Sequence, residues 1–266
     1  MTSVLGKTVL ITGASSGIGM ALAYRMAAEG AQLVLVARSE DALVALAAKL
    51  EADWAVKARV IVHDLSTPGS GKALHDHLRA LGVVVDVLIN NAGFGSYGAF
   101  ESLSAMAEQQ QIAVNVGAVV DLCHAFIPSM LQRGNGAVLN MASTAAFQPG
   151  PSMATYAATK AFVLSFSEAL WAEYRERGVH VTTLCPGAVD TPFIDKLGDS
   201  SVRKAAVFAK TLTADRVADA AIKALRHSAP SRIVGFGNWL MANSLRLAPR
   251  ATVARTAAGM LKASGT

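Results

Sequence analysis

Short apolar runs alternate with helical patterns along most of the chain, and this alternation constrains the fold more than any other feature. Residues 32–37 and 137–142 are apolar at nearly every position, whereas a strand with one solvated face is apolar at every second position. Strands that are buried on both faces belong to parallel sheets whose connections are helices. The sequence therefore predicts an α/β fold with a parallel sheet covered by helices on both faces.

The strand and helix patterns follow each other without a repeat, a low-complexity tract or an interdomain linker, so we expect one domain. The predicted strands are residues 7–13, 32–37, 59–63, 83–89, 137–142, 179–184 and 232–235. The predicted helices are residues 20–28, 41–51, 71–81, 104–132, 152–177 and one that opens at Thr213, a good N-cap. Residues 192–212 have no clean period and are a candidate substrate lid.

A glycine-rich turn joins the first strand to the first helix. A backbone without Cβ atoms can approach a pyrophosphate closely, and free N–H groups at a helix N-terminus attract negative charge. The spacing is G-x-x-x-G-x-G, which differs from the common dinucleotide fingerprint, but its place between strand and helix favours a nucleotide site. The predicted phosphate-binding residues are Gly13, Ser15, Ser16, Gly17, Ile18 and Gly19.

The second strand ends at Ala37, Arg38 and Ser39. Dinucleotide folds that use NAD place an acidic residue near this point, and an Arg there suits the 2′-phosphate of NADP. No carboxylate is present at this strand end, and Arg38 can bind a phosphate as a charge-assisted fork. We expect NADP(H) in preference to NAD(H), with Arg38 and Ser39 in contact with it; a solvated Arg38 at the helix entry is the alternative.

Two further strand ends carry candidate cofactor contacts. Asp64 and Leu65 follow the third strand, where Asp64 either touches an adenine or caps the next segment. Asn91, Ala92 and Gly93 follow the fourth strand, where small residues permit close packing against a cofactor.

The chemistry-bearing residues lie around the fifth strand. Ser143 ends this strand, and Tyr156 and Lys160 are four residues apart on the following helix, so they share one face. A nearby ammonium lowers the pKa of a tyrosine, which makes it a better acid–base group, and a serine can donate a hydrogen bond to a substrate oxygen. Asn115 lies in the middle of the helix 104–132 and is followed closely by Gly117, which suggests a kink or a functional carbonyl, with helix packing as the alternative.

The C-terminal segment is apolar and basic, and Pro249 divides it into two helical pieces. In the second piece Val253, Ala257, Met260 and Leu261 share one face. We rank packing of this helix on its own domain first, with an anionic membrane surface or an oligomer partner as alternatives.

Composition narrows the class of protein. The formal net charge is +5, but the basic residues are scattered, so we expect no nucleic-acid partner. The hydrophobic share is 52% and the charged share is 16%, which favours an oligomer. The two cysteines form no motif, the histidines form no metal site, and the first residues resemble no signal peptide, so we expect a cytoplasmic protein without a metal.

The motifs occur together in the order and spacing of a known family: Thr12 with Gly13, Gly17 and Gly19, then Asn90 to Gly93, Asn115, Ser143, Tyr156 with Lys160, and Pro186 with Gly187. Together they resemble the short-chain dehydrogenase/reductase family over residues 1–235. The resemblance implies a single-domain Rossmann fold with a doubly wound, seven-stranded parallel sheet. The helical extension 236–266 lies beyond it.

The resemblance also implies roles for these residues. Tyr156 would be the general acid or base, Lys160 would lower its pKa and hold the nicotinamide ribose, Ser143 would polarise the substrate carbonyl, and Asn115 would hold a water for proton relay. Residues that would contact the dinucleotide are Asp64, Leu65, Asn91, Ala92, Gly93, Pro186, Gly187, Val189 and Thr191. The expected reaction is hydride transfer between NADP(H) and an apolar ketone, aldehyde or acyl substrate, in a homodimer or homotetramer. A non-catalytic dinucleotide sensor and a membrane-peripheral scaffold are the alternatives.

Overall fold

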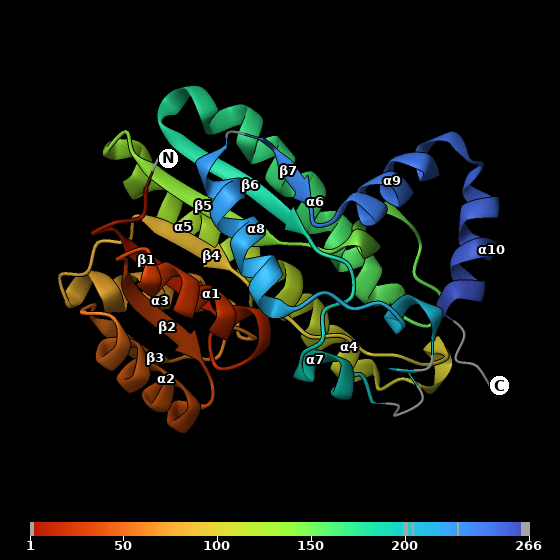
Figure 1. Ribbon diagram of the computed structural model, residues 1–266, viewed down its shortest axis with the longest axis horizontal. Helices are drawn as coiled ribbons and strands as arrows, with labels where there is room; N and C mark the ends of the chain where they lie inside the picture. Colours follow the sequence, from red (N-terminus) through yellow and green to blue (C-terminus); the bar gives the residue numbers. More distant parts are fainter. Residues whose placement is uncertain (1–2, 199–201, 204, 228, 262–266) are drawn as a thin grey trace.

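Seven parallel strands form one sheet at the centre of the molecule (Figure 1). The computed structural model describes residues 3–198, 202–203, 205–227 and 229–261. The strand order is β3-β2-β1-β4-β5-β6-β7, so the order reverses between β1 and β4, where the chain crosses from one half of the sheet to the other. The strands are β1 (Thr8–Thr12), β2 (Gln32–Ala37), β3 (Ala58–Val62), β4 (Val87–Asn90), β5 (Gly136–Met141), β6 (Val179–Cys185) and β7 (Ser231–Ile233).

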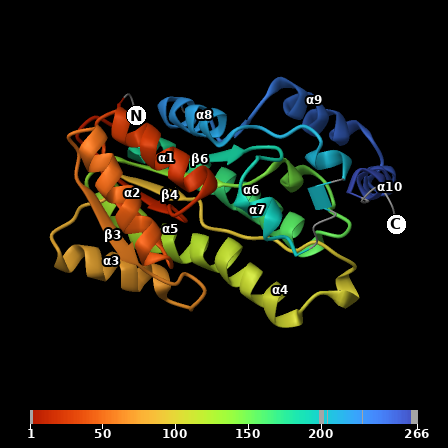
Figure 2. The same cartoon turned by 60° about the horizontal axis from the view of Figure 1, so that its bottom comes forward.

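Helices cover both faces of this sheet, and Figure 2 shows the two layers on either side of it. One face packs against α1 (Gly17–Ala28), α2 (Glu40–Asp53) and α8 (Ala214–Arg226), and the other against α3 (Ser70–Ala80), α5 (Ala118–Gln132) and α6 (Ala154–Tyr174). Each face has its own cluster of buried apolar side chains. The predicted doubly wound, seven-stranded parallel fold is therefore confirmed.

Three further helices lie beyond the carboxyl ends of the strands (Figure 1). They are α7 (Pro192–Asp195), α9 (Phe236–Ser244) and α10 (Arg250–Leu261). The predicted segment without a clean period thus contains α7 and the short 3-10 helix Ala206–Phe208. Pro249 separates α9 from α10 as expected.

Two element boundaries differ from their prediction for local reasons. Helix α1 begins at Gly17, three residues before the predicted start, because the Met20 backbone N–H already donates a helical hydrogen bond to the Ser16 carbonyl at 3.3 Å. Strand β4 begins only at Val87, although the apolar run starts at Val83. Asp86 interrupts the run, and its carboxylate accepts a hydrogen bond from the backbone N–H of Thr8 at 2.9 Å.

The long helix predicted from residue 104 to residue 132 contains a π-helical turn in its middle. Helix α4 (Ala105–Ile112) passes into this turn at Ala113–Gly117, and α5 follows directly. Asn115 lies in the turn and is almost fully buried. The predicted irregularity at Asn115 is therefore real, and it is a widened turn that the helix accommodates without ending.

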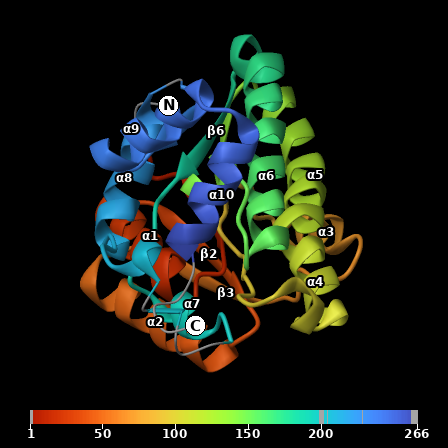
Figure 3. The same ribbon diagram turned by 90° about the vertical axis from the view of Figure 1, so that its right-hand side faces the viewer.

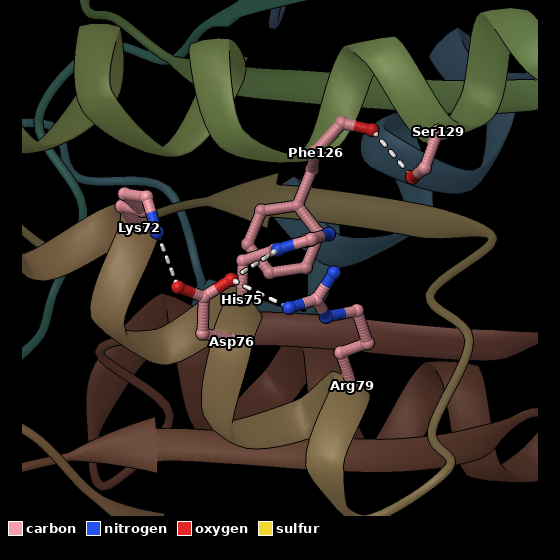
Figure 4. Close-up of polar contacts among 6 residues, drawn as sticks. All are labelled: Lys72, His75, Asp76, Arg79, Phe126 and Ser129. Atoms are coloured by element: carbon pink, nitrogen blue, oxygen red, sulfur yellow. Dashed lines mark hydrogen bonds and ion pairs between the residues drawn. The ribbon is translucent and has the colours of Figure 1, made fainter.

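The segment Ala105–Gln132 is also long and apolar enough, by length and composition, to cross a membrane, with a mean hydropathy of 1.5 in its most apolar window. In the structure its second half packs against α3 and the sheet. Figure 4 shows part of this contact: the His75 ring meets the edge of Phe126 with centroids 5.1 Å apart. In the structure 39% of that window is buried, and α5 packs as a helix that covers the sheet.

His75 and its neighbours have structural partners (Figure 4). Asp76 accepts a hydrogen bond from Lys72, and its carboxylate lies 3.4 Å from His75 Nδ1 and 3.9 Å from Arg79. The hydrogen bond from Lys72 is the main reason why the pKa of Asp76 is lowered. Within the described ranges, no group of three or more His, Cys, Asp or Glu side chains is placed to hold a metal ion.

Candidate active site

A cavity of about 390 Å³ opens at the carboxyl edge of the sheet. It crosses the point between β1 and β4 where the strand order reverses, which is where ligands of open α/β sheets bind. Nineteen of the predicted residues line its wall: Gly13, Ser15, Ser16, Gly17, Ile18, Arg38, Ser39, Asp64, Leu65, Asn91, Ala92, Gly93, Ser143, Tyr156, Lys160, Pro186, Gly187, Val189 and Thr191. Gly19 and Asn115 are the two predicted residues that lie behind the wall.

The glycines of the first turn leave room that side chains would fill. Gly13 and Gly17 have φ of +66° and +56°, in the left-handed region that favours glycine. A Cβ on Gly19 would lie 2.1 Å from the Gly13 carbonyl oxygen, so Gly19 acts through the packing of the turn. At the start of α1, the Ser16 side chain makes no capping hydrogen bond. A bare helix N-terminus beside a glycine cradle fits a dinucleotide pyrophosphate.

A group of hydrogen bonds joins the ends of β1 and β4. Thr12 Oγ1 accepts hydrogen bonds from the backbone N–H groups of Asn91 and Ala92, both at 3.0 Å. The Asn91 side chain donates to the Thr12 carbonyl at 2.9 Å. Thr12 is 1% exposed, and its part in shaping the site was not predicted.

Arg38 and Asp64 lie near each other at the ends of β2 and β3. The hydrogen bond from the Ser66 backbone is the main reason why the pKa of Asp64 is lowered, and the Arg38 charge adds to the effect. Asp64 Oδ1 accepts this bond at 2.9 Å and closes a turn after β3, whereas the N-cap of α3 is Gly69, so Asp64 does not cap the next helix. Asp64 also lines the cavity, as its other prediction required.

Ser143 and Tyr156 face one another across the cavity. Ser143 Oγ accepts a hydrogen bond from the Ala145 backbone at 3.1 Å, which leaves its O–H group available to donate. Burial raises the pKa of Tyr156 to about 12, and a hydrogen bond with Ser143 opposes this rise only partly. Tyr156 is therefore protonated near neutral pH.

The effect of Lys160 on the pKa of Tyr156 differs from the prediction. Its ammonium was expected to lower the pKa of Tyr156, but its Nζ lies 5.7 Å from the centre of the tyrosine ring and donates to the Met141 carbonyl at 2.8 Å. Lys160 is 5% exposed, and burial lowers its own pKa to about 8. The expected lowering at Tyr156 is wrong for this arrangement, because desolvation of the phenolate dominates.

Hydrogen bonds to two segments, one after β4 and one in α6, hold the side chain of Asn115. Its Oδ1 accepts from the Phe94 backbone N–H at 3.1 Å, and its Nδ2 donates to the Phe94 carbonyl at 2.9 Å and to Thr159 Oγ1 at 3.1 Å. A Cβ on Gly93 would lie 2.9 Å from Asn115 Oδ1 and 3.5 Å from Lys160 Nζ. Asn115 thus stands one layer behind Gly93, next to Lys160.

The part of the cavity beyond Tyr156 is mostly apolar. Its lining comes from the start of α6, α7, the 3-10 helix Ala206–Phe208 and both C-terminal helices, and includes Met153, Phe193, Phe208, Met241, Met260 and Leu261. The sequence did not single out these residues as site residues, because an isolated Met or Phe has the same pattern as a core residue. The segment 192–212, which contains Phe193 and Phe208, was predicted as a substrate lid, and the face shared by Met260 and Leu261 was predicted as a packing face.

Comparison with known proteins identifies the family. The model of the short chain dehydrogenase family matches residues 7–201. The probable oxidoreductase EphD of Mycobacterium tuberculosis is 33% identical over 257 residues, which cover 91% of this chain; the chain spans only 43% of the length of EphD. The protein belongs to the short-chain dehydrogenase family.

Two solved structures show the same fold over nearly the whole chain. A short-chain dehydrogenase from Sphingobium yanoikuyae in complex with NADPH is 34% identical, with a TM-score of 0.80 and coverage of 91% of this chain and 94% of that one. A bulky-bulky ketone specific alcohol dehydrogenase from Comamonas testosteroni is 30% identical, with a TM-score of 0.76 and coverage of 91% and 92%.

The buried ammonium of Lys160 predicts a pH dependence of stability. Between about pH 8 and pH 10.5, the lysine has lost its proton in the native state and keeps it in the unfolded chain. Lys160 alone should therefore make the free energy of unfolding rise with pH across this window. The two buried thiols act in the opposite direction above about pH 9, because burial raises the pKa of Cys123 and of Cys185 from 9.0 to about 12. The free energy of unfolding of wild type minus that of Lys160→Met should therefore rise between about pH 8 and pH 10.5, since the thiols are common to both proteins, whereas the exposed-site variant Lys57→Met should follow the wild-type profile. Urea unfolding at pH 7 to 10 measures the effect, and parallel profiles for wild type and Lys160→Met would contradict it.

Proposed function

We propose that the protein is an oxidoreductase that transfers a hydride between NADP(H) and a carbonyl/alcohol pair. This proposal rests on one observation: Ser143, Tyr156 and Lys160 line the same cavity as the glycine turn at the start of α1. Family membership supports the same reaction class. A bound nicotinamide dinucleotide would supply or accept the hydride.

The protein's part in reduction is to hold the carbonyl and deliver a proton. Ser143 Oγ–H donates a hydrogen bond to the carbonyl oxygen and polarises it. Tyr156 transfers its proton to that oxygen, which suits a phenol whose raised pKa keeps it protonated before reaction. Lys160 holds the nicotinamide ribose, and Asn115, directly behind Gly93, positions a water that returns a proton.

NADP(H) is the cofactor that the lining of the cavity favours. Arg38 is the cationic side chain at the end of β2. Among the described residues, no acidic side chain lies within 4 Å of it to form an ion pair. It lines the cavity together with Ser39 and is free to bind a 2′-phosphate. The NADPH complex of the Sphingobium relative supports the same choice.

The substrate in this proposal is an apolar ketone, aldehyde or acyl compound. Methionine, phenylalanine and leucine side chains make up most of the lining beyond Tyr156. The Comamonas alcohol dehydrogenase, which is specific for bulky-bulky ketones, supports a substrate with apolar groups. We further propose the division into a dehydrogenase domain at residues 1–235, with a substrate lid at about 192–212, and a helical extension at 236–266.

Pairing of subunits through the long helices is the assembly we propose. Met106 and Ile112 on α4 and Phe162 on α6 are exposed, and Phe162 stacks on Phe166 with ring centroids 5.7 Å apart. Apolar side chains on the outer face of these two helices support a homodimer or homotetramer in the cytoplasm.

A membrane contact is the second role for the C-terminal segment. Val253, Ala257 and Leu261 of α10 are buried in the protein, which supports packing of this helix on its own domain. Phe236, Trp239, Leu240 and Leu247 in and after α9 are exposed, which supports an interfacial contact there. A redox sensor is a weaker alternative, because Ser143, Tyr156 and Lys160 are all present.

Removal of the Tyr156 hydroxyl tests the enzyme proposal. Tyr156→Phe should lower kcat by about 10²–10⁴-fold, because the proton donor is lost. Its affinity for NADPH, followed by quenching of tryptophan fluorescence, should stay within about twofold. Tyr174→Phe is the matched control and should keep full turnover. A fully active Tyr156→Phe would contradict the assignment and favour the sensor or scaffold.

Removal of the Arg38 side chain tests the cofactor preference. Arg38→Ala should weaken NADPH binding by about tenfold or more and leave NADH binding unchanged, because a charge-assisted hydrogen bond contributes about 1.5–3 kcal/mol. The exposed Arg59→Ala should change neither affinity. If the ratio of the two dissociation constants does not move in Arg38→Ala, the phosphate assignment is wrong.

Flotation with vesicles tests the membrane role. Wild type should stay at the bottom of the gradient with both neutral and anionic vesicles if α10 serves only its own domain. Flotation with anionic vesicles alone, abolished in Trp239→Ala, would instead establish an interfacial contact through α9.

A further inference from the structure

Tyr97 joins the substrate end of the cavity to the last helix of the described chain. Its backbone N–H donates to the Leu197 carbonyl at 3.0 Å, just after α7. Its hydroxyl donates to the carbonyl of Leu261, the last residue of α10. Within the described residues, this is the one side-chain hydrogen bond that reaches α10. Tyr97 thus links three segments that are far apart in the sequence.

The same three segments share a separate apolar cluster. Leu261, Met153, Ile194, Leu197 and Val202 are each at most 7% exposed and pack together, apart from the two clusters that flank the sheet. The aromatic rings of Tyr97, Tyr156 and Phe193 lie against this cluster. The end of α10 is therefore held by apolar packing as well as by the hydrogen bond from Tyr97.

This cluster adjoins the reacting end of the cavity. The Phe193 ring lies 5.5 Å from the ring of Tyr156, centroid to centroid. A Cβ on Gly95 would lie between 3.1 and 3.2 Å from Leu197, Tyr156 and Phe193, so the space between these three side chains depends on a glycine. The apolar part of the cavity therefore runs from Tyr156 toward α7 and α10.

Helix α10 lies at the apolar end of the cavity. Figure 3 views this end of the molecule and shows α10 between the α1–α8 side and the α5–α6 side. Met260 and Leu261 line the cavity, and α10 packs on the 3-10 helix Ala206–Phe208, whose Val207 and Phe208 also line it. Val253 is as buried as Leu261, at 7% exposure, but lies two turns away and outside the lining.

We propose that Met260 and Leu261 form the end wall of the carbonyl-substrate site and that Tyr97 positions this wall. The C-terminal helix then sets the length of the apolar group that the enzyme accepts. The proposal rests on the proposed function and assigns Leu261 as a specificity-determining residue and Tyr97 as a positioning residue. A substrate with one short substituent fits below the wall, and a longer chain meets Leu261.

The position of the end wall is tested by measuring kcat/KM for methyl ketones of growing length, from 2-butanone to 2-dodecanone, with NADPH as the reductant. Leu261→Ala should raise kcat/KM for 2-dodecanone relative to 2-butanone by about tenfold, because each methylene that gains room is worth about that order of discrimination. Leu261→Phe should lower the same ratio. Val253→Ala is the control: it truncates an equally buried residue of the same helix and should leave the ratio unchanged. The assignment of Leu261 to the end wall is wrong if wild type and all three variants have the same ratio of kcat/KM for the two ketones. It is also wrong if Val253→Ala shifts this ratio as much as Leu261→Ala does.

Hydrogen–deuterium exchange tests the positioning role without turnover. Tyr97→Phe should speed exchange in residues 250–261 by about fivefold, since one hydrogen bond is lost, while α6 stays unchanged. Tyr24→Phe, at the other end of the molecule, should have no effect. Unchanged exchange in Tyr97→Phe would overturn the role of Tyr97.

The two arms separate this proposal from the reaction on which it rests. A wild-type protein that binds NADPH and reduces none of the ketones would refute the proposed reaction and, with it, the wall for carbonyl substrates. The exchange result would still decide whether Tyr97 holds α10.

Discussion

The site depends on how closely the ends of β1 and β4 approach each other. A Cβ on Gly13 would lie 2.9 Å from the Cα of Ala92, so the two strand ends meet at a distance that only glycine permits. Thr12 holds this junction, because its hydroxyl oxygen accepts the N–H groups of both Asn91 and Ala92. These buried hydrogen bonds satisfy backbone donors that the parallel ladder cannot reach beyond the strand ends. The junction beside the cavity is thus held by backbone groups and the short side chains of Thr12 and Asn91, with no long side chain that must be ordered first.

From this junction the cavity extends in two directions with different physical character. Toward β2 and β3 the lining is made of turns, small residues and the charges of Arg38 and Asp64, which suits a polar dinucleotide. Toward α7 and α10 it is made of flexible apolar side chains such as Met153 and Met260. Methionine adapts its shape at low cost, so this half can accept apolar groups of different outline. Lys160 and Tyr156 lie where the two halves meet, and burial shifts the pKa of each toward its neutral form.

The sequence predicted the first half of the site well and the second half poorly. Gly17, Ser143 and Tyr156 were found because a turn, a strand end and a helix face each restrict the residue type locally. Gly19 was predicted as a cofactor contact and Asn115 as the residue that holds a relay water, and both lie one layer behind the wall, since spacing along the chain does not distinguish a lining residue from its support. Leu261 and Phe193 meet Tyr156 only through tertiary packing, over which a local pattern has no control. The pKa of Tyr156 was misjudged for the same reason: the presence of a lysine was readable, but the depth of burial was not.

The π-helical turn at Ala113–Gly117 changes how one helix faces two neighbours. Gln111, Asn115 and Val119 follow each other at intervals of four, and in a regular α-helix each such step moves a side chain about 40° round the axis. The wider turn absorbs this drift, so all three residues are buried on one side. The turn therefore adjusts the rotation of the helix about its axis, so that both the part that supports the site, around Asn115, and α5, which covers the sheet, face inward. One consequence is that a single-residue deletion within it would restore a regular α-turn and keep the face that α5 turns toward the sheet, whereas the same deletion inside α4 would rotate α4 by about 100° relative to α5.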